Sequence, residues 1–144
     1  MIDGIPLPAT DDPLAQPFWQ GLAAGELRMQ HCPACGDWWF PPRRRCTRCG
    51  GAAVWQAVSG RGRIWSFVEV HPPVLPAFMP YAPYPVVLVE LEEAAGLRLV
   101  GNVVRERGAG IDSIGAAALV IGRPVTALIE PLAAGIHWPR WILG

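Results

Sequence analysis

The hydrophobic pattern of the second half of the chain predicts a domain built of β-strands. Apolar residues alternate with polar ones or run continuously over short segments, which glycine, proline and acidic residues separate. Residues 54–58 and 64–70 are expected to form one long strand, bent where Gly60 and Gly62 fall. The further expected strands are residues 86–91, 97–104, 125–130 and 137–143, and alanine-rich residues 112–120 are the one candidate for a helix or helical turn in this half.

This order of elements predicts an OB-fold. A long bent strand, a hairpin, a short helix and two more strands is the order of a five-stranded closed barrel whose helix falls between the third and fourth strands. Residues 71–85 interrupt the barrel with a loop that contains six prolines, which exclude a regular strand. The loop carries Phe78, Tyr81 and Tyr84. It either covers one mouth of the barrel or forms a wall of a ligand or partner site.

The first half predicts a short helix and a strand ahead of the barrel. Pro17 opens the helix and Gly25 closes it. The helix is too short to be stable alone, so it must dock on another element. Alternating residues from Leu27 to His31 predict a strand. We therefore expect an arm and helix over residues 1–25, a metal-binding module over 26–53 and a barrel over 54–144, with the arm itself either loose or lying on a partner.

All four cysteines lie in two Cys-x-x-Cys-Gly sequences separated by ten residues. Each such turn places two thiolates on one side of a tight loop, and two turns complete the tetrahedron that zinc prefers. Redox dithiols and disulfides are the competing interpretations, but a redox motif needs only one such turn. Four sulfur ligands leave no open coordination position, so the zinc is expected to be structural. The ligands are Cys32, Cys35, Cys46 and Cys49, and neighbouring His31 is an alternative ligand.

Charge is concentrated in the metal-binding module, although the whole chain has a formal net charge of zero. Residues 28–63 contain seven arginines and one acidic residue, whereas residues 64–144 contain five arginines and seven acidic residues. A zinc ion with four thiolates would leave a charge of about +4 on the first segment. Every basic residue other than histidine is arginine, which suits bidentate phosphate contacts. The candidate phosphate contacts are Arg43, Arg44, Arg45, Arg61 and Arg63.

Several classes of protein are disfavoured by the sequence. We find no signal peptide and no apolar run long enough to span a membrane, so a cytoplasmic location with no membrane contact is expected. Three serines, three threonines, one asparagine and three histidines form no recognisable nucleophile and base spacing. We therefore do not expect the chain to catalyse a reaction alone. His71, at the start of the proline-rich loop, is the one residue that merits testing as a base.

A set of motifs in fixed order resembles a known family. The motifs are the Phe18-Trp19 helix, the four-cysteine ribbon with Phe40-Pro41-Pro42 between its turns, Gly60-x-Gly62, residues 85–91, and Ile121-Gly122-x-Pro124-Val125. Over residues 17–143 they resemble the acyl-CoA-associated zinc-ribbon/OB-fold family, once catalogued as a domain of unknown function. The resemblance implies a rubredoxin-like ribbon joined to an OB-fold, with zinc on the four cysteines. It also implies partnership with thiolase-superfamily proteins such as acyltransferases, hydroxymethylglutaryl-CoA-forming assemblies and steroid side-chain retro-aldolases.

The expected function is that of a non-catalytic subunit of a hetero-oligomer, which docks on a thiolase-like enzyme and helps to hold or pass an acyl-CoA. The arginines would contact phosphate groups, and the aromatic residues of the proline-rich loop would contact the pantetheine or acyl end. Near the C-terminus, Trp138 and Trp141 either close the barrel or insert into a partner. The alternative is a nucleic-acid-binding protein, since zinc ribbons and OB-folds also serve that purpose, but the acidic barrel half argues against it.

Overall fold

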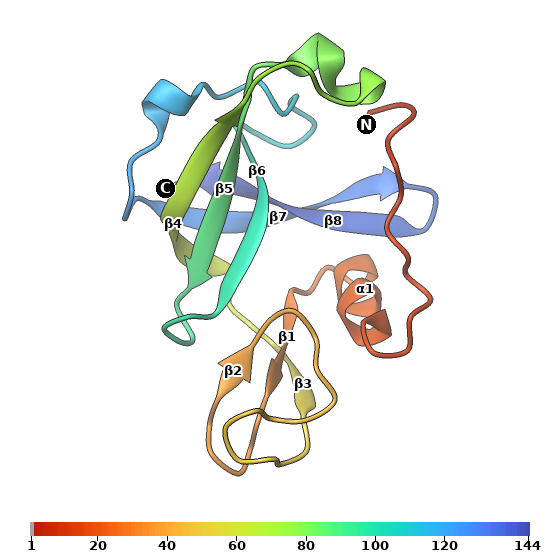
Figure 1. The fold of residues 1–144 in the computed structure, drawn as a ribbon, viewed down its shortest axis with the longest axis vertical. Coiled ribbons are helices and arrows are strands. Elements are labelled where there is room, and N and C mark those ends of the chain that lie inside the picture. Colours follow the sequence, from red (N-terminus) through yellow and green to blue (C-terminus); the bar gives the residue numbers. More distant parts are fainter. Residues whose placement is uncertain (1) are drawn as a thin grey trace.

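The computed structural model describes residues 2–144, as an elongated molecule with a three-stranded sheet at one end and a barrel at the other (Figure 1). None of its described helices is long and apolar enough to cross a membrane. The elements are α1 (Gln16–Ala23), β1 (Arg28–His31), β2 (Trp38–Trp39), β3 (Val54–Ala57), β4 (Arg61–Val70), the three-ten helix η1 (Pro76–Tyr81), β5 (Tyr84–Leu91), β6 (Arg98–Val104), the three-ten turn η2 (Ala116–Ala118), β7 (Pro124–Ala133) and β8 (Ile136–Leu143).

The strands form two separate sheets. The ribbon is an antiparallel sheet in the order β2-β1-β3, and the barrel closes in the order β4-β5-β6-β8-β7. All neighbouring barrel strands are antiparallel except β6 and β8, which run parallel where Val103 faces Trp141. This topology, with η2 between the third and fourth barrel strands, is that of an OB-fold. The predicted mostly-β fold with a short N-terminal helix and a five-stranded barrel is confirmed.

The prediction of one long strand over residues 54–70 is wrong. Val54–Ala57 pairs with β1 in the ribbon, and only Arg61–Val70 belongs to the barrel. Gly60, with φ +77°, turns the chain between the two sheets, and an added β-carbon at Gly62 would lie 2.4 Å from the carbonyl oxygen of Glu90. The glycines therefore mark a change of sheet and a close approach to β5. The bulge of β4 lies further along, between Ile64 and Ser66.

The candidate helix over residues 112–120 is reduced to a single three-ten turn, η2. Alanine favours helix intrinsically, but a short segment needs an apolar face packed on the rest of the protein. No side chain of η2 is buried, and the extended backbone of Gly115 and Leu119 bounds it. The helix propensity of the alanines, without an apolar face packed on the barrel, therefore does not sustain a longer helix over residues 112–120.

Helix α1 joins the two parts of the molecule through a single hydrophobic core. Its Phe18 and Leu22 are buried together with Met29 of β1 and with Trp141 of β8. The helix contacts β1 and β3 on one side and β8 on the other, as its position between ribbon and barrel indicates (Figure 1). Burial of each such side chain contributes about 1.5–3 kcal/mol. The short helix thus docks as predicted, and it does so on both sheets.

The N-terminal arm lies on this chain's own barrel. From α1 it runs along the barrel to the mouth that η1 covers (Figure 1). There Ile2 is only 8% exposed and packs in a cluster with Tyr84 and Ile111. The expectation of an arm that is loose or lies on a partner is therefore corrected, because apolar contacts attach its first residues to the barrel.

Trp141 is a core residue and not a surface contact. It is fully buried, and its indole nitrogen lies 2.8 Å from the point that a β-carbon on Gly101 would occupy. The side chain fills the seam where β6 and β8 run parallel, which only glycine at position 101 allows. Of the two alternatives that the sequence left open for Trp141, a barrel residue or a ligand or partner contact, its burial supports the first.

Replacing Trp141 with alanine is expected to lower the free energy of unfolding by about 3–5 kcal/mol, because it leaves a large cavity in the shared core. Chemical denaturation followed by circular dichroism measures this change. Trp65→Ala is the control, since Trp65 is 47% exposed. Equal stability losses in the two variants would contradict the assignment of Trp141 to the core.

Candidate zinc site and contact surfaces

The two cysteine turns have the same local geometry. In the first, the Cys32 N–H donates to the Asp37 carbonyl at 2.8 Å and the Gly36 N–H donates to the Cys32 carbonyl at 2.7 Å. In the second, the Gly50 N–H donates to the Cys46 carbonyl at 2.9 Å. Gly36 and Gly50 have φ values of +79° and +75°, which L side chains rarely adopt. The glycine of each Cys-x-x-Cys-Gly sequence is therefore required by the turn itself.

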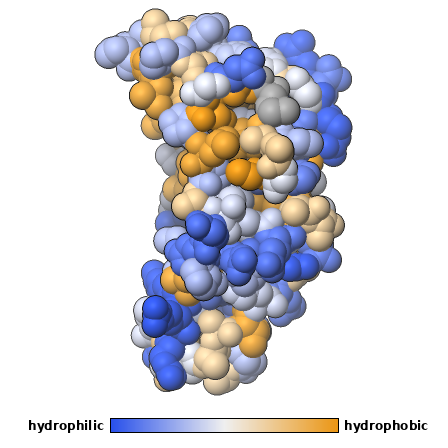
Figure 2. All heavy atoms as spheres, turned by 90° about the vertical axis from the view of Figure 1, so that its right-hand side faces the viewer, coloured by the Kyte–Doolittle hydropathy of each residue, from blue (hydrophilic) through white to orange (hydrophobic). Residues whose placement is uncertain are grey.

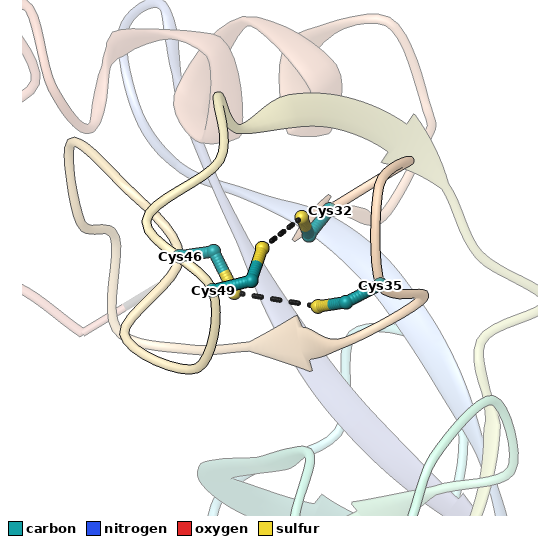
Figure 3. Close-up of side chains that lie close together, drawn as sticks. All are labelled: Cys32, Cys35, Cys46 and Cys49. Carbon is teal, nitrogen blue, oxygen red and sulfur yellow. Dashed lines mark hydrogen bonds between the residues drawn. The ribbon is translucent and has the colours of Figure 1, made fainter.

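The four thiols converge on one point. Their sulfur atoms lie within 4.8 Å of one another, with Cys32 and Cys49 at 3.4 Å and Cys35 and Cys46 at 3.6 Å (Figure 3). Metal–sulfur bonds of about 2.3 Å in a tetrahedron give sulfur–sulfur edges of about 3.8 Å. All four cysteines are free of disulfide bonds. The arrangement fits a tetrahedral zinc ion and not a pair of disulfides.

The electrostatics of the four thiols also favour a bound cation. The backbone N–H of Cys35 lowers the pKa of Cys32 to about 7. At Cys35 the backbone N–H of Asp37 acts in the same direction, but desolvation and the neighbouring thiols outweigh it and raise the pKa to about 12. Four sulfurs this close cannot all carry negative charge without a compensating positive charge. A divalent ion supplies that charge, and with four sulfur ligands its role would be structural.

Gly51 completes the cradle around the sulfurs. Its N–H donates to the Cys49 sulfur at 3.4 Å. A β-carbon on Gly51 would lie 3.1 Å from the Cys32 sulfur and 3.2 Å from the Cys49 sulfur. His31 is not part of this group, because its ring stacks on Trp38 with centroids 4.4 Å apart. The described residues that could hold a metal ion here are therefore the four cysteines named by the spacing.

Gln30 is a structural residue of the site that sequence reasoning missed. It is 3% exposed, and its side-chain oxygen accepts hydrogen bonds of 2.6 Å from the Trp39 indole and from the Arg43 backbone N–H. Its amide nitrogen donates to the Arg43 carbonyl at 2.7 Å. One side chain thus ties β1 to β2 and to the segment that leads into the second cysteine turn. The only sequence signal was a polar residue between apolar strand positions, which alternation assigns to the surface.

The predicted arginine cluster is divided between the two sheets. Arg43, Arg44 and Arg45 are exposed around the second cysteine turn, where Arg43 donates to the Thr47 hydroxyl at 3.0 Å and Arg45 donates to the Gly50 carbonyl at 3.3 Å. Arg61 and Arg63 lie instead at the start of β4 in the barrel. The predicted barrel over residues 54–144 already includes Arg61 and Arg63, so the five arginines do not form one surface.

The two barrel arginines are already engaged within the chain. Arg61 forms an ion pair with Glu92 at 2.5 Å, which lowers the pKa of Glu92, and Arg63 donates to the Gly122 carbonyl at 3.0 Å. Both line a cavity of about 390 Å³, together with Glu90 and Glu92. The two positive and two negative charges balance there. This cavity is consequently a weaker phosphate site than the arginine-rich turn of the ribbon.

The predicted aromatic residues are brought together at the opposite mouth of the barrel. Phe78 and Tyr84 have ring centroids 6.0 Å apart, and Tyr81 and Trp138 belong to the same apolar cluster. His71 lies on the surface nearby in sequence and forms a 2.7 Å contact with Glu69. The arginine-rich turn and this aromatic cluster lie at opposite ends of the molecule (Figure 1).

The outer face of β4, β5 and β6 carries exposed apolar side chains. Val68 and Val100 are 58% and 59% exposed, and together with Val86 and Leu88 they line a shallow cavity of about 270 Å³. Beside it the Arg98 guanidinium lies 3.8 Å from the centre of the Trp65 ring. Exposed aliphatic residues next to an arginine–tryptophan pair are typical of protein interfaces.

Comparisons with known proteins agree with this architecture. A family model described as ChsH2, rubredoxin-like zinc ribbon domain, matches residues 19–54, and one described as ChsH2, C-terminal OB-fold domain, matches residues 55–130. The structure superposes on a chain of the Ltp2-ChsH2(DUF35) aldolase with a TM-score of 0.78 and 28% identity, over 94% of this chain and 98% of that one. A DUF35-family protein from Sulfolobus solfataricus shares the fold, with a TM-score of 0.58 and 16% identity.

Two curated relatives illustrate the range of the matches. The 3-oxo-4,17-pregnadiene-20-carboxyl-CoA hydratase alpha subunit of Mycobacterium tuberculosis is 36% identical over 135 residues, which are 88% of this chain and 35% of that protein. The DUF35 domain-containing scaffold protein of Methanocaldococcus jannaschii is 36% identical over 76 residues, which are 51% of each. The chain therefore spans about a third and about half of the length of these relatives.

Replacing Cys46 with serine is expected to abolish zinc binding, because it removes a buried ligand from the tetrahedral set. The purified protein should contain one zinc ion per chain by inductively coupled plasma mass spectrometry, and C46S close to none. The ribbon amide signals of C46S should lose dispersion in NMR spectra, since structural zinc sites contribute folding energy. Thr47→Ala, in the same turn, should keep its zinc. Retention of zinc by C46S would contradict the site.

Replacing Gln30 with leucine is expected to destabilise the ribbon by about 1–3 kcal/mol for each buried donor left without an acceptor. Hydrogen exchange at ribbon amides measures this effect. Gln56→Leu is the matched control, because Gln56 lies on β3 and is exposed. If both variants exchange at the same rate, Gln30 does not hold the ribbon together.

Proposed function

Because the chain belongs to the ChsH2 (DUF35) family of zinc-ribbon and OB-fold proteins, we propose that it is a non-catalytic accessory subunit. It docks on a thiolase-like enzyme and assists that enzyme in holding or transferring an acyl-CoA thioester during C–C bond formation or cleavage. The observation that carries this proposal is the match of nearly the whole chain to one chain of an aldolase complex. The names of the curated relatives, a hydratase alpha subunit and a scaffold protein, are consistent with such a role.

The outer face of β4, β5 and β6 is the proposed docking surface for the enzyme. Trp65, Val68 and Val100 are each about half exposed or more. Tryptophan and arginine are enriched where binding energy concentrates, and Trp65 with Arg98 forms such a pair. Burial of this face by a partner would remove apolar area from water without unfolding the barrel.

The arginine-rich turn of the ribbon is the proposed contact for the phosphate groups of coenzyme A. Arg43, Arg44 and Arg45 are exposed and each retains guanidinium donors for bidentate phosphate binding. Arg61 and Arg63 are weaker candidates because they are already paired within the barrel. The zinc would maintain the turn that presents these arginines and would take no part in the reaction.

The first test is capture of the tagged protein from its native lysate, followed by mass spectrometry and gel filtration. We expect a thiolase-fold protein in stoichiometric amount, and a Val68→Glu, Val100→Glu variant should lose it while retaining its zinc. Recovery of nucleic acid in place of that protein, or turnover of a thioester by the chain alone, would contradict the proposal. The same complex is then used to measure how replacement of Arg43, Arg44 and Arg45 changes acyl-CoA binding.

In that assembled complex, replacement of Arg43, Arg44 and Arg45 by alanine should weaken acyl-CoA binding about tenfold or more, since each charge-assisted contact contributes about 1.5–3 kcal/mol. The matched lysine variant keeps the charge and should recover part of the affinity. Isothermal titration calorimetry measures both. Unchanged affinity in the alanine variant would remove this turn from the site.

A further inference from the structure

The contacts that attach the described part of the N-terminal arm, from Ile2 onward, to the barrel are apolar. Ile2 and Ile5 pack against the cluster formed by residues of η1, Tyr84 and Ile111. Among the hydrogen bonds between described residues, none involves residues 2–11. Hydrophobic residues gather over the upper half of the face that carries the arm (Figure 2). A segment held by so few contacts opens at low free-energy cost.

Ile2 lines a cavity at this mouth of the barrel. The cavity has a volume of about 240 Å³ and is lined by apolar and aromatic side chains, the turn at residues 108–110 and a buried arginine. Its volume exceeds that of a few water molecules and matches a small organic group. The lining side chains are those of Ile2, Tyr81, Ile111, Trp138 and Arg140.

The arginine in this lining belongs to a buried ion pair. Arg140 is 6% exposed and Glu130 is 4% exposed, and the two side chains are 2.8 Å apart. The second oxygen of Glu130 accepts a hydrogen bond of 2.6 Å from the Gly108 N–H, and Arg140 also donates to the Ala109 carbonyl. The pair therefore holds the turn at residues 108–110 in place. It also leaves the cavity with no net charge, so an anion would gain little there.

Two buried donors at the cavity have no acceptor among the described residues. They are the Nε–H of Arg140 and the indole N–H of Trp138. Both side chains line the cavity, and the Arg140 guanidinium lies 5.3 Å from the centre of the Trp138 ring. A buried donor without an acceptor costs about 1–3 kcal/mol. Both nitrogen atoms are closed to contact in this structure, so an acceptor on a bound molecule would recover that cost only once the lining of the cavity moves.

We propose that this cavity binds an uncharged, carbonyl-bearing apolar ligand and that Ile2 covers the cavity until the ligand displaces it. Amide or ketone oxygens of the ligand provide the acceptors that Arg140 and Trp138 lack, and Ile111 and Tyr81 contact its carbon skeleton. The site goes beyond the proposed function, because it lies at the opposite end of the molecule from the arginine-rich turn and needs no partner enzyme.

The test uses the full chain labelled with ¹⁵N, whose seven tryptophans give seven indole signals. Pantetheine, an amide chain, and cyclohexanone, a cyclic ketone, are added separately, and inorganic phosphate serves as the anionic probe. The signal of Trp138, assigned with Trp138→Phe, should shift with one or both carbonyl probes and not with phosphate. The probe that binds more tightly distinguishes an amide ligand from a ketone ligand. No shift with either carbonyl probe, or an equal shift with phosphate, would overturn the proposal.

Two variants then test whether the Trp138 indole binds the ligand and whether Ile2 competes with it. Trp138→Phe keeps an aromatic ring and removes one donor, so its Kd, followed through the backbone amide signals of residues 108–111 because the indole signal is lost, should rise about fivefold. Ile2→Ser weakens the cover, so its Kd should fall severalfold, whereas Leu7→Ser, on an exposed part of the same arm, should leave the Kd unchanged. A higher or unchanged Kd in I2S would show that Ile2 does not compete with the ligand. If I2S does not fold, the Kd of the Trp138→Phe variant decides whether the ligand binds at this cavity. A crystal structure in which only an ordered water lies between the two donors would count against the site.

Discussion

The fold depends on the burial of Leu22 and Phe18 of α1 between the ribbon and the barrel. The ribbon strands have four, two and four residues, which is too little to enclose a core of their own. The ribbon therefore gains its stability from the metal site at one end and from the barrel core, through α1 and Met29, at the other. This shared core also fixes the orientation of the cysteine turns relative to the barrel, so any molecule that contacts both encounters one rigid surface.

Within the ribbon, polar contacts provide stability that a hydrophobic core provides in a larger domain. Gln30 joins two strands and the segment before the second cysteine turn, and both polar atoms of its buried amide have hydrogen-bond partners. The four sulfurs lie at the end of the ribbon away from the barrel core and need a cation, and Arg43 and Arg45 donate to Thr47 and Gly50 of the second cysteine turn. In the proposed function, a phosphate group would bind to arginines of this turn, whose shape the four cysteines and Gln30 maintain.

Local sequence patterns predicted the elements well, because their causes are local. Cys-x-x-Cys-Gly requires the same turn wherever it occurs, and the apolar run over residues 86–91 forms a barrel strand whose positions are all buried or half-buried. The errors concern long-range pairing. Nothing in residues 54–57 indicates that they pair with β1 and not with a barrel strand, so the boundary between ribbon and barrel was placed too early in the chain. Glu130 and Arg140 also escaped notice, since charged residues in alternating strands are normally exposed and only the folded barrel buries them as a pair.

The buried ion pair of Arg140 and Glu130 is unusual at the mouth of a barrel. Removing two charges from water costs several kcal/mol per ion, and apolar residues of similar size are often at least as stable. Arg140 and Glu130 recover this cost only in part, because burial lowers the pKa of Arg140 despite the nearby carboxylate and one of its N–H groups is left without an acceptor. In return, the pair forms directional hydrogen bonds to Gly108 and Ala109, which fix the turn at residues 108–110. A hydrophobic pair could fill the same volume, but it could neither orient these backbone groups nor present a donor at the cavity wall.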